Sequence, residues 1–210
     1  RSGLKKGRIV LTRRQDEAPL YAGNLFRYFL EQEGVVVRGS VGMMTDGFSE
    51  ARLVYRHTSP YDLAHIIERL LEYSNNFTAN QLLLAMGTRC YGPPATLDKG
   101  VQALSAYARD VIGIPNGVFV EGSGISRHNR LSVRDMVTVL HHFRPYAHLM
   151  PHEGSEYYKT GTLKGVRTRV GYIDLGPGKR YCFALFRNRS NQTTAPIMRQ
   201  VHRYLSTDRN

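Results

Sequence analysis

Three strand-like runs in the last third of the chain constrain its fold more than any other feature of the sequence. They cover residues 157–162, 168–175 and 180–187, and β-branched and aromatic residues recur in them. Gly176-Pro177-Gly178 separates the last two runs and supplies a hairpin turn. A final helix over residues 196–205 follows. Strands joined by such short connections pair antiparallel, so the sequence predicts an antiparallel meander with a helix packed on it.

Segments with helical spacing of apolar residues precede these strands. The expected helices cover residues 18–32, 61–71, 77–86, 97–112 and 133–143. Ser59-Pro60 begins the second helix and Thr96 caps the fourth, while Ser132 and Asp135 have the capping-box spacing for the fifth. Helices followed by a meander predict the α/β (α+β) class, an antiparallel sheet covered by helices.

Three short apolar runs outside these helices are predicted to be strands, at residues 35–37, 53–55 and 118–120. Residues 39–49 hold several Gly, Thr, Asp and Ser residues and are expected to form a loop. We find no internal repeat and no linker that marks a second domain. The expected parts are a helical subdomain at about 57–150 and a sheet with its terminal helix at about 151–206.

The chain of 210 residues is strongly basic, with 23 Arg and six Lys and a formal net charge of +12. This charge predicts attraction to polyanions or to an anionic surface. Nucleic-acid binding is disfavoured because the arginines are scattered and no recognisable binding motif accompanies them. No apolar run approaches the length of a membrane span. The sequence starts at Arg1 without a leader, which says nothing about export.

The two cysteines, Cys90 and Cys182, lie far apart and form no metal-type or redox-type spacing. Two buried thiols are expected, with a single disulfide as the alternative. His128 and the pair His141-His142 lack a grouping with carboxylates or cysteines, so we expect no metal site and no cofactor.

Two short motifs carry candidate chemistry. Lys159-Thr160-Gly161 is followed by Thr162 and stands in a predicted strand, whereas Ser74-Asn75-Asn76 lies where one predicted helix ends and another begins. Each has an ordinary alternative, a solvated Lys beside a turn and a helix cap respectively. Lys-Thr-Gly resembles the third active-site motif of serine penicillin-recognising enzymes, and Ser-x-Asn is its usual partner upstream.

A longer stretch narrows this resemblance to one family. Residues 121–132, Glu-Gly-Ser-Gly-Ile-Ser-Arg-His-Asn-Arg-Leu-Ser, resemble the Asp-Gly-Ser-Gly-Leu-Ser-Arg-x-Asn signature of the D-alanyl-D-alanine carboxypeptidase/endopeptidase family of penicillin-binding proteins. Residues 159–166 and 171–173 extend the likeness, which covers about 19–204. Glu121 stands where the family usually has Asp. The resemblance implies an incomplete β-lactamase/DD-peptidase-like transpeptidase fold, of which residues 1–210 are the C-terminal part.

The resemblance also implies roles for the motif residues. Ser74 would relay a proton to the leaving nitrogen, Asn76 would hold the substrate's peptide carbonyl, and Lys159 would supply positive potential. Thr160 and Thr162 would bind the terminal carboxylate. The N–H of Thr162 would form half of an oxyanion hole, with Gly161 allowing close approach of the substrate.

The family's first motif, Ser-x-x-Lys, supplies the nucleophile, and here its only match is Ser2-Gly3-Leu4-Lys5. This match is short, cationic and terminal, so a desolvated Lys and a rigid helix start are not expected there. The resemblance therefore implies a serine-type D-Ala-D-Ala carboxypeptidase, or endopeptidase, of the periplasm or another extracytoplasmic site. It would act on peptidoglycan peptide stems and be inhibited by β-lactams when complete, while this chain alone would be inactive. The alternative is a non-catalytic basic module that binds anionic cell-wall polymer.

Overall fold

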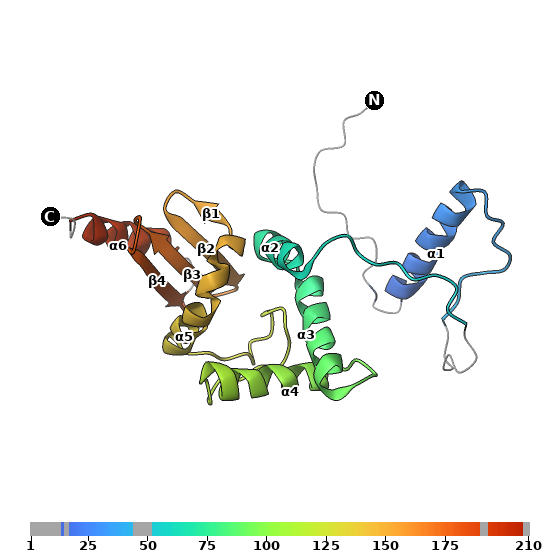
Figure 1. The fold of residues 1–210 in the computed structure, drawn as a ribbon, viewed down its shortest axis with the longest axis horizontal. Helices are drawn as coiled ribbons and strands as arrows, with labels where there is room; N and C mark the ends of the chain where they lie inside the picture. Colours follow the sequence, from blue (N-terminus) through green and yellow to red (C-terminus); the bar gives the residue numbers. More distant parts are fainter. Residues whose placement is uncertain (1–13, 15–16, 44–51, 190–192, 208–210) are drawn as a thin grey trace, which may run out of the picture. The chain divides into compact units, whose positions relative to one another are not determined.

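The computed structural model describes residues 14, 17–43, 52–189 and 193–207. They belong to two compact units, Arg1–Thr58 and Ser59–Asn210. The first unit contains helix α1 (Glu17–Gln32), against which the following segment folds back (Figure 1). Arg27 Nη1 donates to the carbonyl of Gly39 over 2.7 Å. A side chain at Gly23 would lie 2.5 Å from Val41 Cγ1, so a small residue is needed where the two segments meet.

Two predicted strands in this unit are wrong. Residues 35–37 and 53–55 are not in strands, and their side chains are exposed apart from that of Val37, which is half-buried; Val36 is 81% and Val54 90% exposed. A strand needs a neighbour for its backbone hydrogen bonds, and neither segment has a paired strand in the described part of the chain. Of the predicted loop at 39–49, residues 44–49 lie outside the described residues.

The second unit begins with helices, whose ends follow their capping residues. Its helical elements are α2 (Leu63–Tyr73), α3 (Asn76–Tyr91), α4 (Leu97–Tyr107), the π-helical turn η1 (Ala108–Ile112), α5 (Val133–Phe143) and the 3-10 segment η2 (Arg144–Leu149). Helix α2 starts later than expected because Asp62, not Ser59, is its N-cap and accepts from the His65 N–H. Thr96 and the Ser132–Asp135 capping box act as predicted.

Helices α3 and α4 touch through glycines. A side chain at Gly87 would come within 2.4 Å of the Gly100 nitrogen, and one at Gly100 within 2.6 Å of the Leu83 oxygen. The third predicted short strand, at residues 118–120, is reduced to a single bridge between Val118 and Arg130. The cysteines form no disulfide, and the expectation of two buried thiols is wrong for Cys90, which is exposed.

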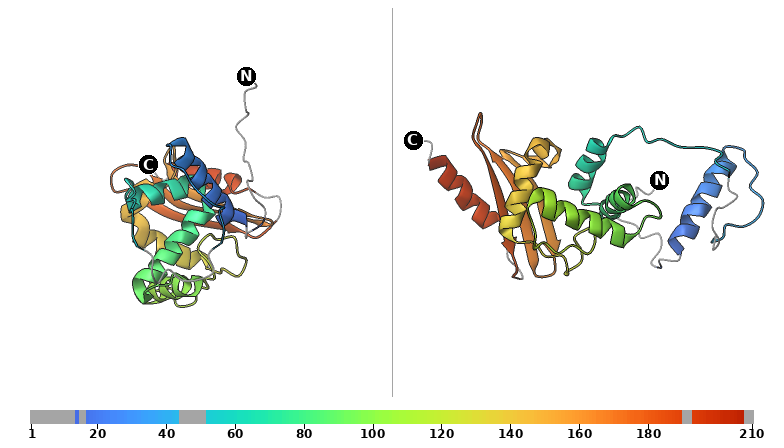
Figure 2. Two further views of the ribbon diagram at one scale, coloured as in Figure 1. Left: turned by 90° about the vertical axis from the view of Figure 1, so that its right-hand side faces the viewer. Right: turned by 60° about the horizontal axis from the view of Figure 1, so that its bottom comes forward.

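The rest of the unit is the predicted antiparallel meander. Strands β1 (His152–Glu153), β2 (Glu156–Leu163), β3 (Val166–Asp174) and β4 (Arg180–Arg187) pair in the order β1-β2-β3-β4, and α6 (Ala195–Thr207) follows. Helices α5 and α6 lie on opposite faces of this sheet (Figure 2). Tyr172 donates to the Leu140 carbonyl of α5, whereas Glu156 contacts His202 of α6.

The core lies between the sheet and the helices on the α5 face. Its buried centre consists of Leu140, Ala147, Met150 and Tyr172. Leu71, near the end of α2, packs against this centre. Leu71 thus holds the end of α2 against the same core that Tyr157 of β2 contacts, and Ser74 follows three residues later.

Candidate active site

Ser74 occupies a left-handed backbone position at the junction of α2 and α3. Its φ of 53° is the only positive value at a residue other than glycine in the described part of the chain. Its N–H donates to the Leu70 carbonyl and ends α2. Asn75 then accepts from the Thr78 N–H over 3.1 Å and caps α3. Both caps rely on the backbone of Ser74 and the side chain of Asn75, which leaves the Ser74 hydroxyl available for other contacts.

Lys159 reaches that hydroxyl from the sheet. It lies in the middle of β2, opposite Val170 of β3, and its Nζ donates to Ser74 Oγ. A second hydrogen bond runs to the Thr160 carbonyl over 3.2 Å. Partial burial lowers the pKa of the Lys159 ammonium, and no carboxylate in the described residues pairs with it. An amine with this lowered pKa gives up its proton more easily and can exchange it with a hydroxyl.

Thr160, Gly161 and Thr162 continue β2 along an edge that no strand covers in the described part of the chain. Strand β1 pairs only with Glu156 and Tyr157. The Tyr158 N–H turns away from β3, since it donates to Pro151. Backbone groups alternate along a strand, so the N–H groups of Thr160 and Thr162 point to this open edge too.

The side chains of the two threonines do not share the face of the sheet that carries Lys159. Thr160 and Thr162 are exposed and stand on the other face, opposite Arg169 and Arg167. A side chain at Gly161 would lie 2.5 Å from Thr168 Oγ1. Packing against β3 is thus a structural reason for this glycine.

Asn76 is the first residue of α3 and is exposed. Its side chain has no hydrogen-bond partner among the described residues, so its amide is open to a ligand near Ser74. The structure therefore brings Ser74 and Lys159 into contact and leaves Asn76 and the β2 edge accessible. The Ser2–Lys5 match lies outside the described residues.

The turn at residues 121–132, which carries the family resemblance in the sequence, also takes part in the site. The Glu121 carboxylate accepts from the N–H groups of Ser123 and Ser126, the Ser123 hydroxyl and the Asn129 amide. Desolvation raises the pKa of Glu121, but these hydrogen bonds outweigh it and hold the pKa below its ordinary value. The longer carboxylate at this position thus organises its own turn.

This turn also joins the two parts of the chain that form the site, α3 on one side and the β2–β3 hairpin on the other. The Gly122 N–H donates to Asn80 of α3 over 2.8 Å, and Arg127 Nη2 donates to the Lys164 carbonyl at the β2–β3 turn. Asn80 gave no signal in the sequence, because its role depends on a contact 42 residues away.

The described residues contain neither a metal-binding cluster nor a membrane-spanning helix. No group of three or more His, Cys, Asp or Glu side chains could hold a metal ion. None of the described helices has both the length and the apolar character needed to cross a membrane.

The chain is similar in sequence to known D-alanyl-D-alanine carboxypeptidases. The model of the D-Ala-D-Ala carboxypeptidase 3 (S13) family matches residues 5–149. A D-alanyl-D-alanine carboxypeptidase of Actinomadura sp. is 29% identical over 213 residues, covering 86% of this chain and 38% of that protein. The D-alanyl-D-alanine carboxypeptidase DacB of Haemophilus influenzae is 26% identical over 193 residues, covering 80% and 40%. The chain thus spans about two fifths of the length of these relatives.

The fold has counterparts among solved structures. The crystal structure of penicillin binding protein 4 (dacB) from Haemophilus influenzae matches with a TM-score of 0.77 and 22% identity, covering 92% of this chain and 49% of that one. Its complex with a β-lactam matches with a TM-score of 0.74 and 23% identity, covering 94% and 52%. The expected DD-peptidase-like fold class is confirmed.

Proposed function

Because the chain belongs to the D-Ala-D-Ala carboxypeptidase 3 (S13) family, we propose that it carries two active-site motifs of a serine-type D-Ala-D-Ala carboxypeptidase. The substrates would be peptidoglycan peptide stems, cleaved through an acyl-enzyme outside the cytoplasm. The single observation that carries this proposal is the hydrogen bond between Lys159 Nζ and Ser74 Oγ, which joins the two motifs across 85 residues.

Ser74 and Lys159 act together in this proposal. The Ser74 hydroxyl both donates and accepts, so it passes a proton to the leaving nitrogen. Lys159 supplies positive potential and, through its lowered pKa, restores the proton that Ser74 has given away. Asn76 holds the peptide carbonyl of the substrate from the start of α3.

The open edge of β2 receives the substrate as an added strand. Its outward N–H groups bind the extended peptide, and the N–H of Thr162 forms one half of the oxyanion hole. The hydroxyls of Thr160 and Thr162 contribute hydrogen bonds to the terminal carboxylate. Gly161 keeps the strand close to β3 and free of a side chain beside the substrate.

The nucleophile is not supplied by the described residues of this chain. The only Ser-x-x-Lys in the sequence is Ser2–Lys5. We therefore propose that the 210-residue chain alone is not acylated by a fluorescent penicillin, while the complete enzyme is inhibited covalently by β-lactams. Stable labelling that disappears in Ser2→Ala would contradict this part of the proposal.

Binding of substrate without acylation tests the motif assignment directly. Titration of the isotope-labelled chain with diacetyl-L-lysyl-D-alanyl-D-alanine should shift the backbone amide signals of Thr160, Gly161 and Thr162. Lys159→Ala should weaken this binding about tenfold, as expected for a lost charge-assisted hydrogen bond. Lys179→Ala removes the same charge from the β3–β4 turn and should have no effect.

The rival function, a basic module for anionic cell-wall polymer, gives the opposite pattern. It predicts salt-sensitive binding to isolated cell walls that survives both Lys159→Ala and Ser74→Ala. Binding of this kind, without shifts along the β2 edge on addition of peptide, would overturn the peptidase proposal.

A further inference from the structure

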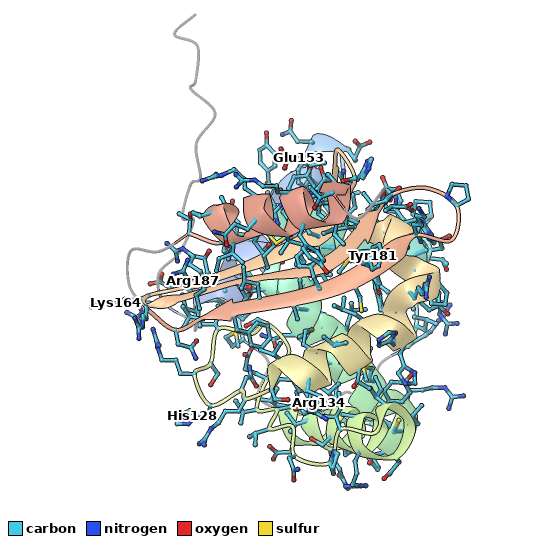
Figure 3. All side chains as sticks on the ribbon, turned by 90° about the vertical axis from the view of Figure 1, so that its left-hand side faces the viewer. His128, Arg134, Glu153, Lys164, Tyr181 and Arg187 are labelled. Atoms are coloured by element: carbon cyan, nitrogen blue, oxygen red, sulfur yellow. The ribbon has the colours of Figure 1, made fainter. Side chains whose placement is uncertain are left out.

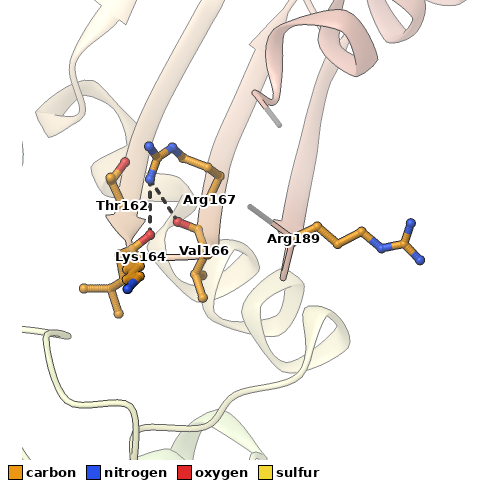
Figure 4. Close-up of a pocket in the computed structure, with 7 residues that line it drawn as sticks. Thr162, Lys164, Val166, Arg167 and Arg189 are labelled. Carbon is orange, nitrogen blue, oxygen red and sulfur yellow. Dashed lines mark hydrogen bonds between the residues drawn. The ribbon is translucent and has the colours of Figure 1, made fainter. Parts of the chain in front are cut away.

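A hollow of about 560 Å³ lies around the β2–β3 turn, at the end of the open edge of β2 (Figure 4). Its lining includes Thr162 and three cationic side chains, Lys164, Arg167 and Arg189. No acidic side chain lines it. The Arg189 side chain extends away from the turn in Figure 4, whereas Arg167 lies against it beside Thr162. The hollow is therefore suited to an anion, and among the cations that line it Arg167 stands directly opposite Thr162 of β2.

Arg167 is fixed in place but keeps part of its hydrogen-bonding capacity. It stands directly opposite Thr162 on β3, so the guanidinium and the Thr162 hydroxyl share one face of the sheet. Its Nη1 donates to the Leu163 carbonyl over 3.2 Å and to the Val166 carbonyl over 3.3 Å. In the described residues its Nε and Nη2 make no further contact, which leaves one edge of the guanidinium fork open.

The neighbouring arginine on the same face is already used. Arg169 Nη2 lies 2.7 Å from Glu156 Oε2, and its guanidinium stacks 3.7 Å above the Tyr158 ring. Its side chain is only 15% exposed. Arg169 thus serves the interior of the sheet, and Arg167 is the arginine that a ligand at the end of β2 can reach.

We propose that Arg167 is a specificity-determining residue that binds the free α-carboxylate of the peptide's last residue, together with the hydroxyl of Thr162. The inference rests on the proposed function and extends it. A guanidinium fork matches the two oxygens of a carboxylate, and an amide at the same place offers neither the charge nor the second acceptor. Arg167 accordingly favours cleavage at a peptide terminus over cleavage within a cross-linked chain.

The test compares two probes that differ only at the terminus, diacetyl-L-lysyl-D-alanyl-D-alanine and its C-terminal amide. Dissociation constants are measured by following the amide signals of Thr160 to Thr162. The wild-type chain should bind the free acid about tenfold more tightly than the amide. Arg167→Gln should bring the two dissociation constants within about twofold, and Arg167→Lys should keep part of the preference because it keeps the charge.

The matched control is Arg134→Gln, which removes the same charge from α5, away from Lys164 at the end of the β2–β3 hairpin (Figure 3). It should retain the full preference. The dispersion of the amide signals and the thermal unfolding of each variant show whether it is folded. If Arg167→Gln does not fold, Arg167→Lys is compared with the wild type instead.

The outcomes separate this inference from the proposed function. Equal binding of both probes by the wild-type chain, or a preference that survives in Arg167→Gln, overturns the role of Arg167 and leaves the peptidase motifs standing. If neither probe shifts the β2 signals, the proposed function fails and the inference fails with it.

Discussion

The two walls of the candidate site are built in different ways. The β2 wall is held by contacts between residues far apart in the sequence, whereas at the α2–α3 junction the backbone is set by caps within a few residues, between the more distant contacts of Leu71 and Asn80. The Lys159–Ser74 hydrogen bond joins the two. The sheet thus sets the position of Lys159 firmly, whereas the position of Ser74 depends on local backbone geometry.

An ionic cluster anchors the sheet wall. The Glu156 side chain is only 9% exposed and lies 2.7 Å from Arg169 Nη2 and 2.5 Å from His202 Nε2, so it ties β2 to β3 and α6. The contact with Arg169 is an ion pair without hydrogen-bond alignment, since neither Glu156 Oε2 nor Arg169 Nε has a hydrogen-bond partner in the described residues. Lys159 follows Glu156 by three residues on the same strand.

The helix wall is more open. Ser74 sits between Tyr73 and Phe77, whose side chains are 61% and 72% exposed. The Asn75 N-cap is worth about 1 kcal/mol, whereas removal of one partner from a buried ion pair costs about 3–5 kcal/mol. Disturbance of this wall should therefore alter the site with little effect on global stability.

The largest expected effect comes from breaking the sheet wall. Glu156→Gln leaves Arg169 without its carboxylate in the sheet interior and should lower the free energy of unfolding by about 3 kcal/mol. For a chain of this size the melting temperature should fall by about 6–12 °C. Circular dichroism melts measure this directly.

Glu72→Gln is the matched control, because Glu72 makes an exposed ion pair with Arg69 at 2.7 Å. Its cost should stay below about 1 kcal/mol. Equal losses in the two variants would show that the buried cluster does not anchor β2.

A smaller effect is expected at the turn that connects the walls. Glu121→Gln removes a charge that receives four hydrogen bonds, and should cost about 2 kcal/mol at neutral pH. The folded state lowers the pKa of Glu121 from its ordinary 4.5, so its contribution is complete above that value and is lost as the pH falls through the folded pKa.

Urea unfolding at pH 7 and at pH 3 checks this sign. The difference between wild type and Glu121→Gln should be largest at pH 7 and should shrink in acid. A difference that is the same at both pH values would mean that the charge of Glu121 is not what organises the turn.

The comparison of walls also explains which features the sequence could reveal. Helix α5 begins and ends where it was predicted, since its capping box and apolar period are local. The meander was also predictable from local signals, namely strand-like runs and the Gly176-Pro177-Gly178 turn. Residues 35–37 have an equally strand-like composition, but a strand also depends on a partner, and composition does not report one.

The site was predictable only in part. Only the resemblance to a family predicted that Ser74 and Lys159 act together, because no local pattern links residues so far apart in the sequence. Arg167 and Glu156 gave no signal, since their roles depend on strand register and on which face of the sheet each side chain occupies. Sequence patterns thus located the two motifs, whereas the residues around them could be identified only from the strand register in the structure.

The smallest effect, and the sharpest test of the comparison, is expected at Asn75. Asn75→Ala removes the side chain that caps α3 and should cost about 1 kcal/mol, whereas Asn75→Ser should restore most of it. Asn76→Ala is the matched control, because Asn76 makes no capping bond among the described residues.

If the helix wall depends on local caps, Asn75→Ala should loosen Ser74 and expose Lys159 to water. The pKa of Lys159 should then rise toward its ordinary 10.5, while the amide signals of β3 stay unchanged. Nuclear magnetic resonance of the lysine side chains measures that pKa. An unchanged pKa in a destabilised variant would show instead that the sheet alone sets the environment of Lys159.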